Sequence, residues 1–449
     1  MKKFLGIDFG TSNSTCAVVD NGRAYALDID GGSNTLQSLI YINPKHETVV
    51  GSQAVSRYLE DVENIASKPP QIVPTGKYIQ ILKSAASGGF GGYERVAEMV
   101  EMDISGRGRL FQSLKSVLPN REYKGTRVFE KFYNLEDLLT ILLKELKIRA
   151  EEKSGCNFDK AVIGRPVKYL KGPLGQATAI GRMEKIAKNA GFKDVFFEYE
   201  PVGAALNFGV DIKTKSNILT FDFGGGTLDI CIMSFPEKKV LATVGIPIGG
   251  DLMNTEIFKS KLLSYFGEGV TVNDGKFEIP KHLMLDLENW YSISRLKTKA
   301  NIDSIDYLIS IADEKEQLIA LKELILSDSG FKIYQEVNKA KIELSSQDLS
   351  MINFSGKSFD IKEAISKVEF EDLIKIYLDR IVKLLNQSLD QAGIKKEELD
   401  MVITTGGSSN IPAVKNLLVN YFGKEKITFG ESFTSVALGL ALKAESLFG

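Results

Sequence analysis

A short stretch near the middle of the sequence combines carboxylates, glycines and a hydroxyl. Asp222 ends the apolar run Leu219–Phe221, Gly224–Gly226 form a turn, and Thr227 and Asp229 follow. The run is too short and too rich in β-formers for a helix, so the pattern predicts two strands joined by a glycine turn. Three glycines let backbone N–H groups point the same way, which makes a cradle for an anion such as phosphate. The flanking carboxylate and hydroxyl are what a magnesium-nucleotide requires in addition.

A second copy of this pattern lies near the N-terminus. The segment Phe4–Asn13 repeats the order of apolar strand, aspartate, phenylalanine, glycine and hydroxyl, and Ala17–Val19 supply a returning strand. Two such hairpins half a chain apart predict a duplicated fold that holds one polyphosphate from both sides. Plain tight hairpins without a ligand, or a chance repeat of Asp-Phe-Gly, remain the alternatives at this point.

The composition is that of an ordinary globular protein. A chain of 449 residues is long enough for two domains, and a net charge of −2 gives no basic excess for nucleic acid or an anionic membrane surface. Asp8 comes too early for an N-terminal leader, and no apolar run is long enough to span a membrane. We therefore expect a cytoplasmic protein with no nucleic-acid or membrane partner.

Cysteines and histidines are too few and too dispersed for several kinds of site. Cys16, Cys156 and Cys231 are far apart in the sequence, which argues against a disulfide framework and a zinc site. His46 and His282 are the two histidines, so a histidine base or a histidine metal cage is not expected.

The first half of the chain is expected to form one lobe, residues 1–200, with a peripheral subdomain at about 43–120. Within this subdomain, Lys68–Pro70 and Ser87–Gly92 are predicted to be surface loops. Asn134 is expected to cap a core helix. A strand, a helix and a second strand, at 161–166, 177–191 and 195–197, predict a βαβ unit.

The second half, residues 201–449, is expected to form the other lobe, with a helical insertion at about 256–345. The strand Met401–Thr405 leads into the turn Gly406–Ser408, which predicts a third backbone cradle. A small-residue helix at 432–449 is expected to pack back towards the first lobe.

Five ordered motifs carry a resemblance to a known family. They are Asp8–Thr11, Glu200–Ala205, Asp222–Asp229, Gly249–Asp251 and Gly406–Ser408. In this order they resemble the ATPase domain of DnaK-type heat-shock chaperones, within the actin and hexokinase superfamily. The long insertion is similar to that of the short YegD-like branch. The resemblance implies an α/β fold of two actin-like lobes, with duplicated ribonuclease-H-like mixed sheets, that closes on magnesium-ATP or ADP.

The resemblance also implies roles for individual residues. Asp8, Asp222 and Glu200 correspond to the carboxylates that hold Mg²⁺ through its waters. Lys115 is similar to the catalytic lysine, which orients water and neutralises the charge that develops during phosphoryl transfer. A solvated surface lysine is the alternative for Lys115. Asp229 corresponds to a residue near the attacking water or a monovalent ion such as K⁺.

The implied nucleotide contacts come from all the motifs and from one further helix. Thr11 and Thr227 correspond to hydroxyls that face the γ-phosphate, and Lys341 and Ser345 correspond to ribose and adenine contacts one helical turn apart. The whole implied set is Gly10, Thr11, Ser12, Asn13, Gly224, Gly225, Gly226, Thr227, Gly249, Gly250, Lys341, Ser345, Gly406, Gly407 and Ser408.

The sequence departs from the family pattern at the adenosine. Ile342 and Asn410 stand where two arginines sandwich the adenine, Asn338 stands for a ribose-binding glutamate, and Asn13 stands for a tyrosine. Loss of guanidinium stacking is expected to weaken nucleotide binding or to shift base preference.

The sequence ends at Gly449, where DnaK-type chaperones continue into a peptide-binding β-sandwich and a lid. We therefore expect a slowly hydrolysing, chaperone-like ATPase without that domain, whose partners are a nucleotide and a protein client or co-chaperone. The alternatives are a small-molecule kinase, which needs a base aspartate beyond the magnesium set, and an actin-like scaffold that assembles through the helical insertion. A Walker-type P-loop is excluded at Gly356–Ser358, because Met351 replaces its leading glycine.

Overall fold

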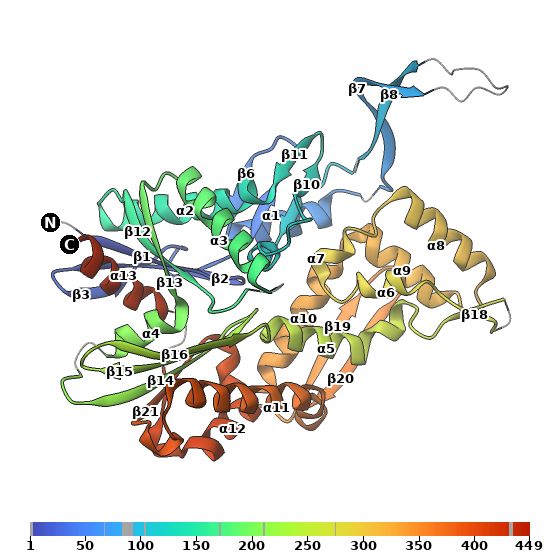
Figure 1. Cartoon of the computed structure of the whole chain (residues 1–449). Helices are drawn as coiled ribbons and strands as arrows, with labels where there is room; N and C mark the ends of the chain where they lie inside the picture. Colours follow the sequence, from blue (N-terminus) through green and yellow to red (C-terminus); the bar gives the residue numbers. More distant parts are fainter. Residues whose placement is uncertain are drawn as a thin grey trace.

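The structure is a computed structural model that describes residues 3–66, 68–82, 93–102, 105–169, 172–209, 212–273, 275–430 and 434–449. Two mixed sheets, one from each half of the chain, lie on either side of the middle of the molecule (Figure 1). Each sheet has its own large buried core. The predicted α/β class with duplicated mixed sheets is confirmed.

The first sheet has the strand order β13-β12-β1-β2-β3, with β4 paired to β2. Its strands are β1 (Phe4–Phe9), β2 (Asn13–Asp20), β3 (Arg23–Ala26), β4 (Thr35–Gln37), β12 (Lys160–Arg165) and β13 (Asp194–Tyr199). β1 is antiparallel to β2 and parallel to β12. Because helices cover both of its faces, β2 is buried at nearly every position, and its apolar residues form the continuous run Cys16–Val19 rather than an alternating pattern.

The second sheet repeats this arrangement, with the order β16-β15-β14-β21-β22. Its strands are β14 (Ser216–Phe223), β15 (Leu228–Phe235), β16 (Lys239–Ile246), β21 (Met401–Thr405) and β22 (Ile427–Phe429). β14 is antiparallel to β15 and parallel to β21, as β1 is to β2 and β12. In both sheets, therefore, a glycine turn joins the first antiparallel pair.

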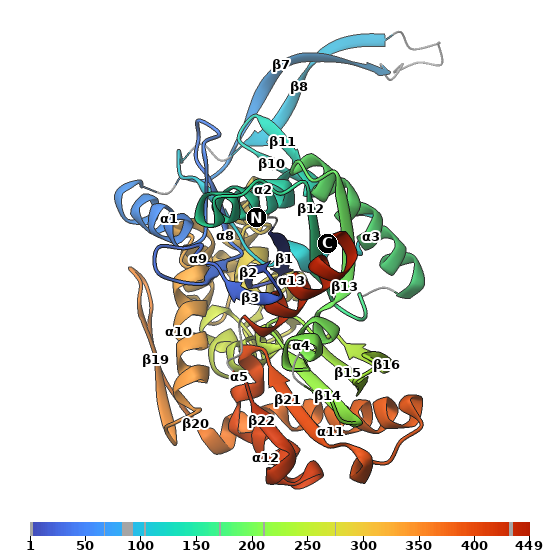
Figure 2. The ribbon, with the colours of Figure 1, turned by 90° about the vertical axis from the view of Figure 1, so that its left-hand side faces the viewer.

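Two short helices of small residues pack between the sheets. α4 (Glu200–Phe208) and α13 (Ser435–Phe448) cross so closely that a Cβ on Gly439 would overlap the carbonyl of Gly203. α13 also packs against β1, β2 and β12, so the C-terminal helix lies on the first sheet (Figure 2). This close crossing explains why both helices are rich in glycine and alanine.

The other large helices cover the outer faces of the sheets. They are α2 (Leu135–Ser154), α3 (Gly172–Asn189), α11 (Lys367–Ala392) and α12 (Pro412–Phe422). The N-terminus of α2 has a capping box, in which the Asn134 backbone N–H donates to the Asp137 carboxylate at 3.1 Å. Gly155 ends α2 in the left-handed region at φ 67°, where glycine has no steric penalty.

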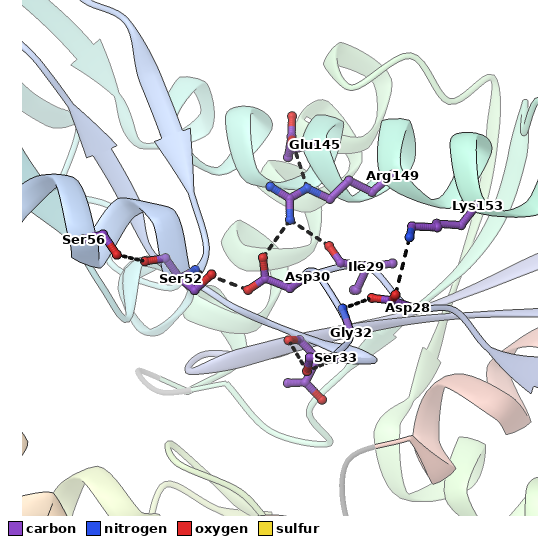
Figure 3. Close-up of polar contacts among 11 residues, drawn as sticks. Asp28, Ile29, Asp30, Gly32, Ser33, Ser52, Ser56, Glu145, Arg149 and Lys153 are labelled. Carbon is purple, nitrogen blue, oxygen red and sulfur yellow. Dashed lines mark hydrogen bonds and ion pairs between the residues drawn. The ribbon is translucent and has the colours of Figure 1, made fainter.

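An arginine of α2 fixes the turn that follows β3 (Figure 3). The Arg149 guanidinium donates to the Asp30 carboxylate at 3.0 Å and to the Ile29 carbonyl at 2.7 Å. Asp30 in turn accepts from the backbone N–H of Ser52, at the start of α1 (Ser52–Asn64), at 3.3 Å. The network therefore ties α1 and the turn to the core of the first lobe.

The region at 43–120 is more regular than predicted. It contains α1, the small sheet of β5 (Ile40–Ile42), β6 (Thr48–Val50) and β9 (Arg109–Phe111), and a long ribbon of β7 (Gln71–Leu82) and β8 (Tyr93–Met102) that projects from the body (Figures 1 and 2). The prediction of an exposed loop at Lys68–Pro70 is wrong for Pro70, which is buried. The predicted loop at Ser87–Gly92 lies outside the described residues.

The first lobe is completed by the single turn η1 (Leu114–Val117) and the hairpin of β10 (Gly125–Val128) and β11 (Lys131–Asn134). The second lobe carries a long helical insertion and a hairpin. These comprise α5 (Gly250–Leu262), η2 (Leu263–Phe266), β17 (Thr271–Val272), β18 (Phe277–Glu278), α6 (Lys281–Leu285), α7 (Trp290–Ile293), α8 (Lys299–Ile311), α9 (Glu316–Ser327), α10 (Gly330–Glu343), β19 (Leu349–Ser355) and β20 (Asp360–Ser366). The insertion shares one hydrophobic core with the second sheet.

Candidate functional site

A cavity of about 690 Å³ lies between the two sheets, where their glycine turns meet. Most of the sequence-predicted site residues line it: Asp8, Gly10, Thr11, Ser12, Asn13, Lys115, Glu200, Asp222, Gly224, Gly225, Gly226, Thr227, Gly250, Lys341, Ser345, Gly406, Gly407 and Ser408. Gly249 and Asp229 are not among the lining residues, but each contacts a turn or strand that forms the wall.

The tips of the two hairpins face each other across this cavity. The first hairpin joins β1 to β2 through Gly10–Ser12, and the second joins β14 to β15 through Gly224–Gly226. A Cβ at Gly225 would overlap the Ser12 hydroxyl, and one at Gly226 would lie 3.2 Å from the Thr11 hydroxyl. Only glycine allows the backbone amides and the opposite hydroxyls to come this close.

The second hairpin is held from behind by the start of α5. Gly250 N–H donates to the Gly224 carbonyl at 3.1 Å, and Asp251 N–H donates to the Gly225 carbonyl at 2.9 Å. A Cβ on Gly249 would overlap the Gly225 carbonyl, so this position has no room for a side chain. The two motifs Asp222–Asp229 and Gly249–Asp251 therefore form one packed unit.

The first hairpin has a different support, which the sequence did not indicate. Ser38 donates its hydroxyl to the Gly10 carbonyl at 2.9 Å and its backbone N–H to the Ser12 carbonyl at 2.8 Å. Its hydroxyl also lies 2.9 Å from that of the buried Ser14. Ser38 thus acts as a brace for the turn, although it stands outside every recognised motif.

Three carboxylates converge at the phosphate end of the cavity. Burial raises the pKa of Asp222 to about 7, and the nearby Glu200 carboxylate adds to the rise. Burial and Glu200 also raise the pKa of Asp8 well above its usual range. Thr405, at the end of β21, donates its hydroxyl to Asp222 at 2.8 Å and was not predicted as a site residue.

Lys115 is the cation beside these carboxylates. Its ammonium lies 2.7 Å from the Glu200 carboxylate, and the residue is only 5% exposed. Burial lowers the pKa of Lys115, but the charge and hydrogen bond of Glu200, together with Tyr169 and Asp8, more than offset this, so the pKa is raised. Lys115 is therefore a buried, charged residue and not a solvated surface lysine.

Asp229 lies behind the second hairpin, directly opposite Asp222 in the β14–β15 pair. One carboxylate oxygen accepts from the Val167 N–H at 2.9 Å, whereas the other is buried and has no hydrogen-bond partner among the described residues. Burial, with the Glu200 charge, raises the pKa of Asp229 well above its usual range. An unsatisfied buried carboxylate oxygen is the kind of atom that a water or a cation completes.

Asp251 is a fourth carboxylate in the cavity wall. Its carboxylate accepts from the Ser113 hydroxyl at 3.5 Å and lies against Ser12, so it reaches the other lobe. Burial raises the pKa of Asp251, while the Lys341 charge lowers it. The sequence placed Asp251 in a motif but gave it no role.

The opposite end of the cavity is lined by longer polar side chains. Lys341 donates to the Gly250 carbonyl at 3.0 Å, and burial lowers its pKa to about 8. Ile342 and Asn410, which replace the expected arginines, both line the cavity, and Ile342 is 59% exposed. Asn338 also lines it and accepts from the Asn254 amide at 3.2 Å.

A cluster of contacts joins the first lobe to the helical insertion of the second lobe, next to the cavity residue Phe331. Arg107 donates to the Asp328 carboxylate at 3.0 Å, Lys297 pairs with the same oxygen at 2.9 Å, and Tyr58 donates to the Asp328 carbonyl at 2.9 Å. We call Tyr58, Arg107, Lys297 and Asp328 the latch. Phe331 lines the cavity and packs edge-on against Tyr58, so the latch is in contact with the cavity wall.

In the described part of the chain, no group of three or more His, Cys, Asp or Glu side chains lies close enough to bind a metal ion directly. Asp8, Asp222 and Glu200 nevertheless fit an Mg²⁺ that is held through its waters. Each is buried or half-buried, and the raised pKa values of the two aspartates show that their negative charge is poorly compensated by Lys115 alone.

Comparisons with known proteins agree with this geometry. The model of the family described as Hsp70 protein matches residues 305–449, and the model described as MreB/Mbl protein matches residues 128–267. The duplicated sheets and the two facing hairpins define the class: the chain has the actin-like ATPase fold. In this respect it is similar to the families described as Hsp70 protein and MreB/Mbl protein.

Individual relatives are similar along the whole chain. The chain is 27% identical over 458 residues to a chaperone protein DnaK of Cyanidioschyzon merolae, covering 100% of this chain and 62% of the relative. It is 26% identical over 449 residues to that of Mycoplasmopsis agalactiae, covering 99% and 59%. For the protein of Thermus thermophilus the values are 27% over 461 residues, 100% and 62%. The chain thus spans about three fifths of these relatives.

None of the described helices is both long enough and apolar enough to cross a lipid bilayer.

Proposed function

We propose that this protein binds ATP and ADP with Mg²⁺ and hydrolyses ATP slowly, as a chaperone-type ATPase. The observation that carries the proposal is the meeting of two glycine hairpins over one cavity that also holds three carboxylates and a buried lysine. Backbone amides from both sides are suited to a polyphosphate, and the DnaK-like relatives support the nucleotide.

The roles of individual side chains follow from their positions. A bound Mg²⁺ would neutralise phosphate charge, and Asp8, Asp222 and Glu200 would hold its waters. Thr11 and Thr227, on opposite hairpins, are placed to donate to the terminal phosphate. Positioning and electrostatics supply most of the rate in phosphoryl transfer, so no covalent intermediate on the protein is needed.

Lys115 and Asp229 are the candidates for the hydrolytic step. The Lys115 ammonium is charged, buried and fixed by Glu200, so it can stabilise charge that develops on the phosphoryl group. The free oxygen of Asp229 can accept a hydrogen bond from the attacking water, or contact a monovalent cation such as K⁺.

We further infer that nucleotide state sets the closure of the two lobes, 1–200 and 201–449, and that a protein client or co-chaperone reads this closure. The latch supports this idea, because Tyr58 of α1 and Arg107 both contact Asp328 of the insertion and so join the two lobes beside the cavity. The same proposal includes a YegD-like affiliation, which the long insertion supports. It also includes a cytoplasmic location, which the three free cysteines support.

A small-molecule kinase is the second candidate, because Asp251 is a carboxylate beyond the magnesium set that lines the cavity. Its contacts argue for the nucleotide role instead: Ser12, Ser113 and Lys341 surround it, and its backbone holds the second hairpin. A kinase would transfer phosphate to an added acceptor, whereas the ATPase releases it to water.

The test is calorimetric titration of the protein with ATP, ADP and GTP, with and without Mg²⁺, followed by a phosphate-release assay. We expect ATP and ADP to bind with micromolar affinity and to bind at least ~10-fold more weakly without Mg²⁺. Lys375→Gln, an exposed change on α11, serves as the matched control. Binding that is indifferent to Mg²⁺, or no binding at all, would contradict the proposal.

A further inference from the structure

A second, smaller cavity lies behind the loop that supports the second hairpin. It has a volume of about 280 Å³ and is lined by Ile246, Pro247, Ile248, Arg380, Lys383, Leu384 and Gln387. The first three residues end β16 and precede α5, and the other four come from α11. Arg380, Lys383, Leu384 and Gln387 are spaced i, i+3, i+4 and i+7, so they form one face of that helix.

The floor and the rim of this cavity differ in chemistry. Ile248 and Leu384 are buried and form an apolar floor, whereas Arg380, Lys383 and Gln387 are exposed at the rim. In the described chain neither Arg380 nor Lys383 has an ion-pair partner, and the Arg380 guanidinium lies 5.7 Å from the Tyr377 ring. Two uncompensated cations above an apolar floor are complementary to an anion that carries an apolar group.

The cavity shares a wall residue with the candidate nucleotide site. Pro247 lines both cavities. Ile248 N–H donates to the Ile246 carbonyl at 2.9 Å, and the next residues, Gly250 and Asp251, donate to the carbonyls of the second hairpin. A ligand that moves the loop at 246–248 therefore also moves the support of the phosphate cradle.

We propose that this cavity is an effector site for a small carboxylate with an apolar body, and that its occupancy changes the affinity of the nucleotide site. The carboxylate would bind Arg380 and Lys383, and the apolar body would lie on Ile248 and Leu384. The volume suits one aliphatic or aromatic group and is too small for a nucleotide. The coupling, but not the binding itself, rests on the nucleotide function proposed above.

The direct test is titration of the full chain, without nucleotide, with isocaproate, a leucine-sized carboxylate. We expect a Kd of about 0.1–1 mM, the range of a small ligand with few contacts. Arg380→Gln and Lys383→Gln are each expected to weaken binding at least ~5-fold, because each removes one charge-assisted contact. Lys375→Gln, an exposed change on the same helix, should have no effect, and isocaproamide should not bind. The proposed site would be overturned if isocaproate bound Arg380→Gln and Lys383→Gln as tightly as the wild type, or if isocaproamide bound as tightly as isocaproate.

Two further arms identify the source of the carboxylate and test the coupling. Acetyl-glycyl-leucine with a free carboxyl terminus should bind more tightly than isocaproate if the natural ligand is a protein terminus, and no more tightly if it is a free metabolite.

Saturating isocaproate should change the dissociation rate of Mg-ADP at least ~2-fold in the wild type, and should leave that rate unchanged in Arg380→Gln. An unchanged rate overturns the coupling. Absence of Mg-ADP binding would instead contradict the proposed function and leave the titration as the test of the site.

Discussion

The two ends of the central cavity are built in different ways. At the phosphate end, backbone turns, small hydroxyls and buried carboxylates are packed so tightly that single glycines have no room for a Cβ. At the opposite end, the wall consists of longer side chains on α10 and around Gly406–Ser408, and one of them, Ile342, is more than half exposed. Substitutions at the phosphate end should therefore reduce nucleotide affinity severely, whereas those at the opposite end should change it by smaller, graded amounts.

The difference has a physical reason. A polyphosphate needs many donors at fixed positions, which backbone amides in packed turns provide at little entropic cost. A base and a sugar can be bound by several alternative side chains, so we expect this end to tolerate changes such as Ile342 and Asn410. The geometry thus favours a fixed set of contacts at the phosphate end and an adjustable nucleotide affinity at the opposite end.

The largest effect is expected from Gly249→Ala. The added Cβ would overlap the Gly225 carbonyl and displace the second hairpin, so we expect nucleotide affinity to fall more than ~100-fold and stability to fall by about 1–3 kcal/mol. Gly181→Ala, on α3, is the control because a Cβ there meets no neighbouring atom. Calorimetry and thermal unfolding measure both changes, and wild-type affinity in Gly249→Ala would show that the phosphate end is not tightly packed.

A smaller effect, on the rate of nucleotide release, is expected at the latch. Arg107→Met removes the guanidinium from Asp328 and leaves Lys297 as its partner, so we expect Mg-ADP to dissociate about 10-fold faster, a change of about 1.4 kcal/mol. Arg57→Met breaks an exposed pair with Glu60 and is the control, with no expected change. Stopped-flow release of a fluorescent ADP measures the rates; equal rates in the two variants would exclude a latch.

At the base end, affinity should depend on pH through Lys341. Burial lowers its pKa to about 8, so the ammonium is mostly charged at pH 7 and mostly neutral at pH 9. Because the neutral amine attracts the nucleotide less, we expect ATP affinity to fall by up to ~10-fold between these values. Lys341→Arg, which stays charged, should flatten the profile. A profile that is equally steep in this variant would assign the titration to another group.

The smallest expected effect is a gain in ATP affinity. Ile342→Arg combined with Asn410→Arg restores the two guanidinium groups expected around an adenine, and each cation–π contact at an exposed site contributes about 0.5–1 kcal/mol. We expect ATP to bind about 3–10-fold more tightly, with no change for inorganic triphosphate. Calorimetry with both ligands separates the base from the phosphates. Nanomolar ATP affinity in the wild type would refute the idea that this end is weakened.

The same contrast explains what could be predicted from the sequence. The hairpins, the Glu200 turn and the Gly406 turn were recognisable because glycine, aspartate and threonine are required at fixed spacings along one short segment. The structure then brings these segments together, as the duplicated fold implied. The repeated hairpins predict a duplicated fold by themselves, whereas the actin-like class of that fold is what the resemblance of the five ordered motifs implies.

The missed features all depend on contacts between distant segments. Thr405 and Asp222 are 183 residues apart, and Arg107 and Asp328 are 221 residues apart. Ser38 and Asp251 also gain their roles from long-range contacts. The β7–β8 ribbon is missing from the prediction because the segments Lys68–Pro70 and Ser87–Gly92, which flank β7 and β8, indicate surface loops of an irregular region. A single sequence without a fold does not reveal which distant polar residues become neighbours.

The central claim is that both hairpins act on one magnesium-nucleotide, and phosphate release by Asp222→Asn tests it most directly. Asparagine keeps the shape of the side chain and can still accept from Thr405, so the fold should remain intact. Loss of the carboxylate should reduce phosphate release from ATP at least ~100-fold, because it removes charge that the metal site requires. Asp390→Asn, an exposed change near the end of α11, should leave the rate unchanged. A wild-type rate of phosphate release in correctly folded Asp222→Asn would contradict the account.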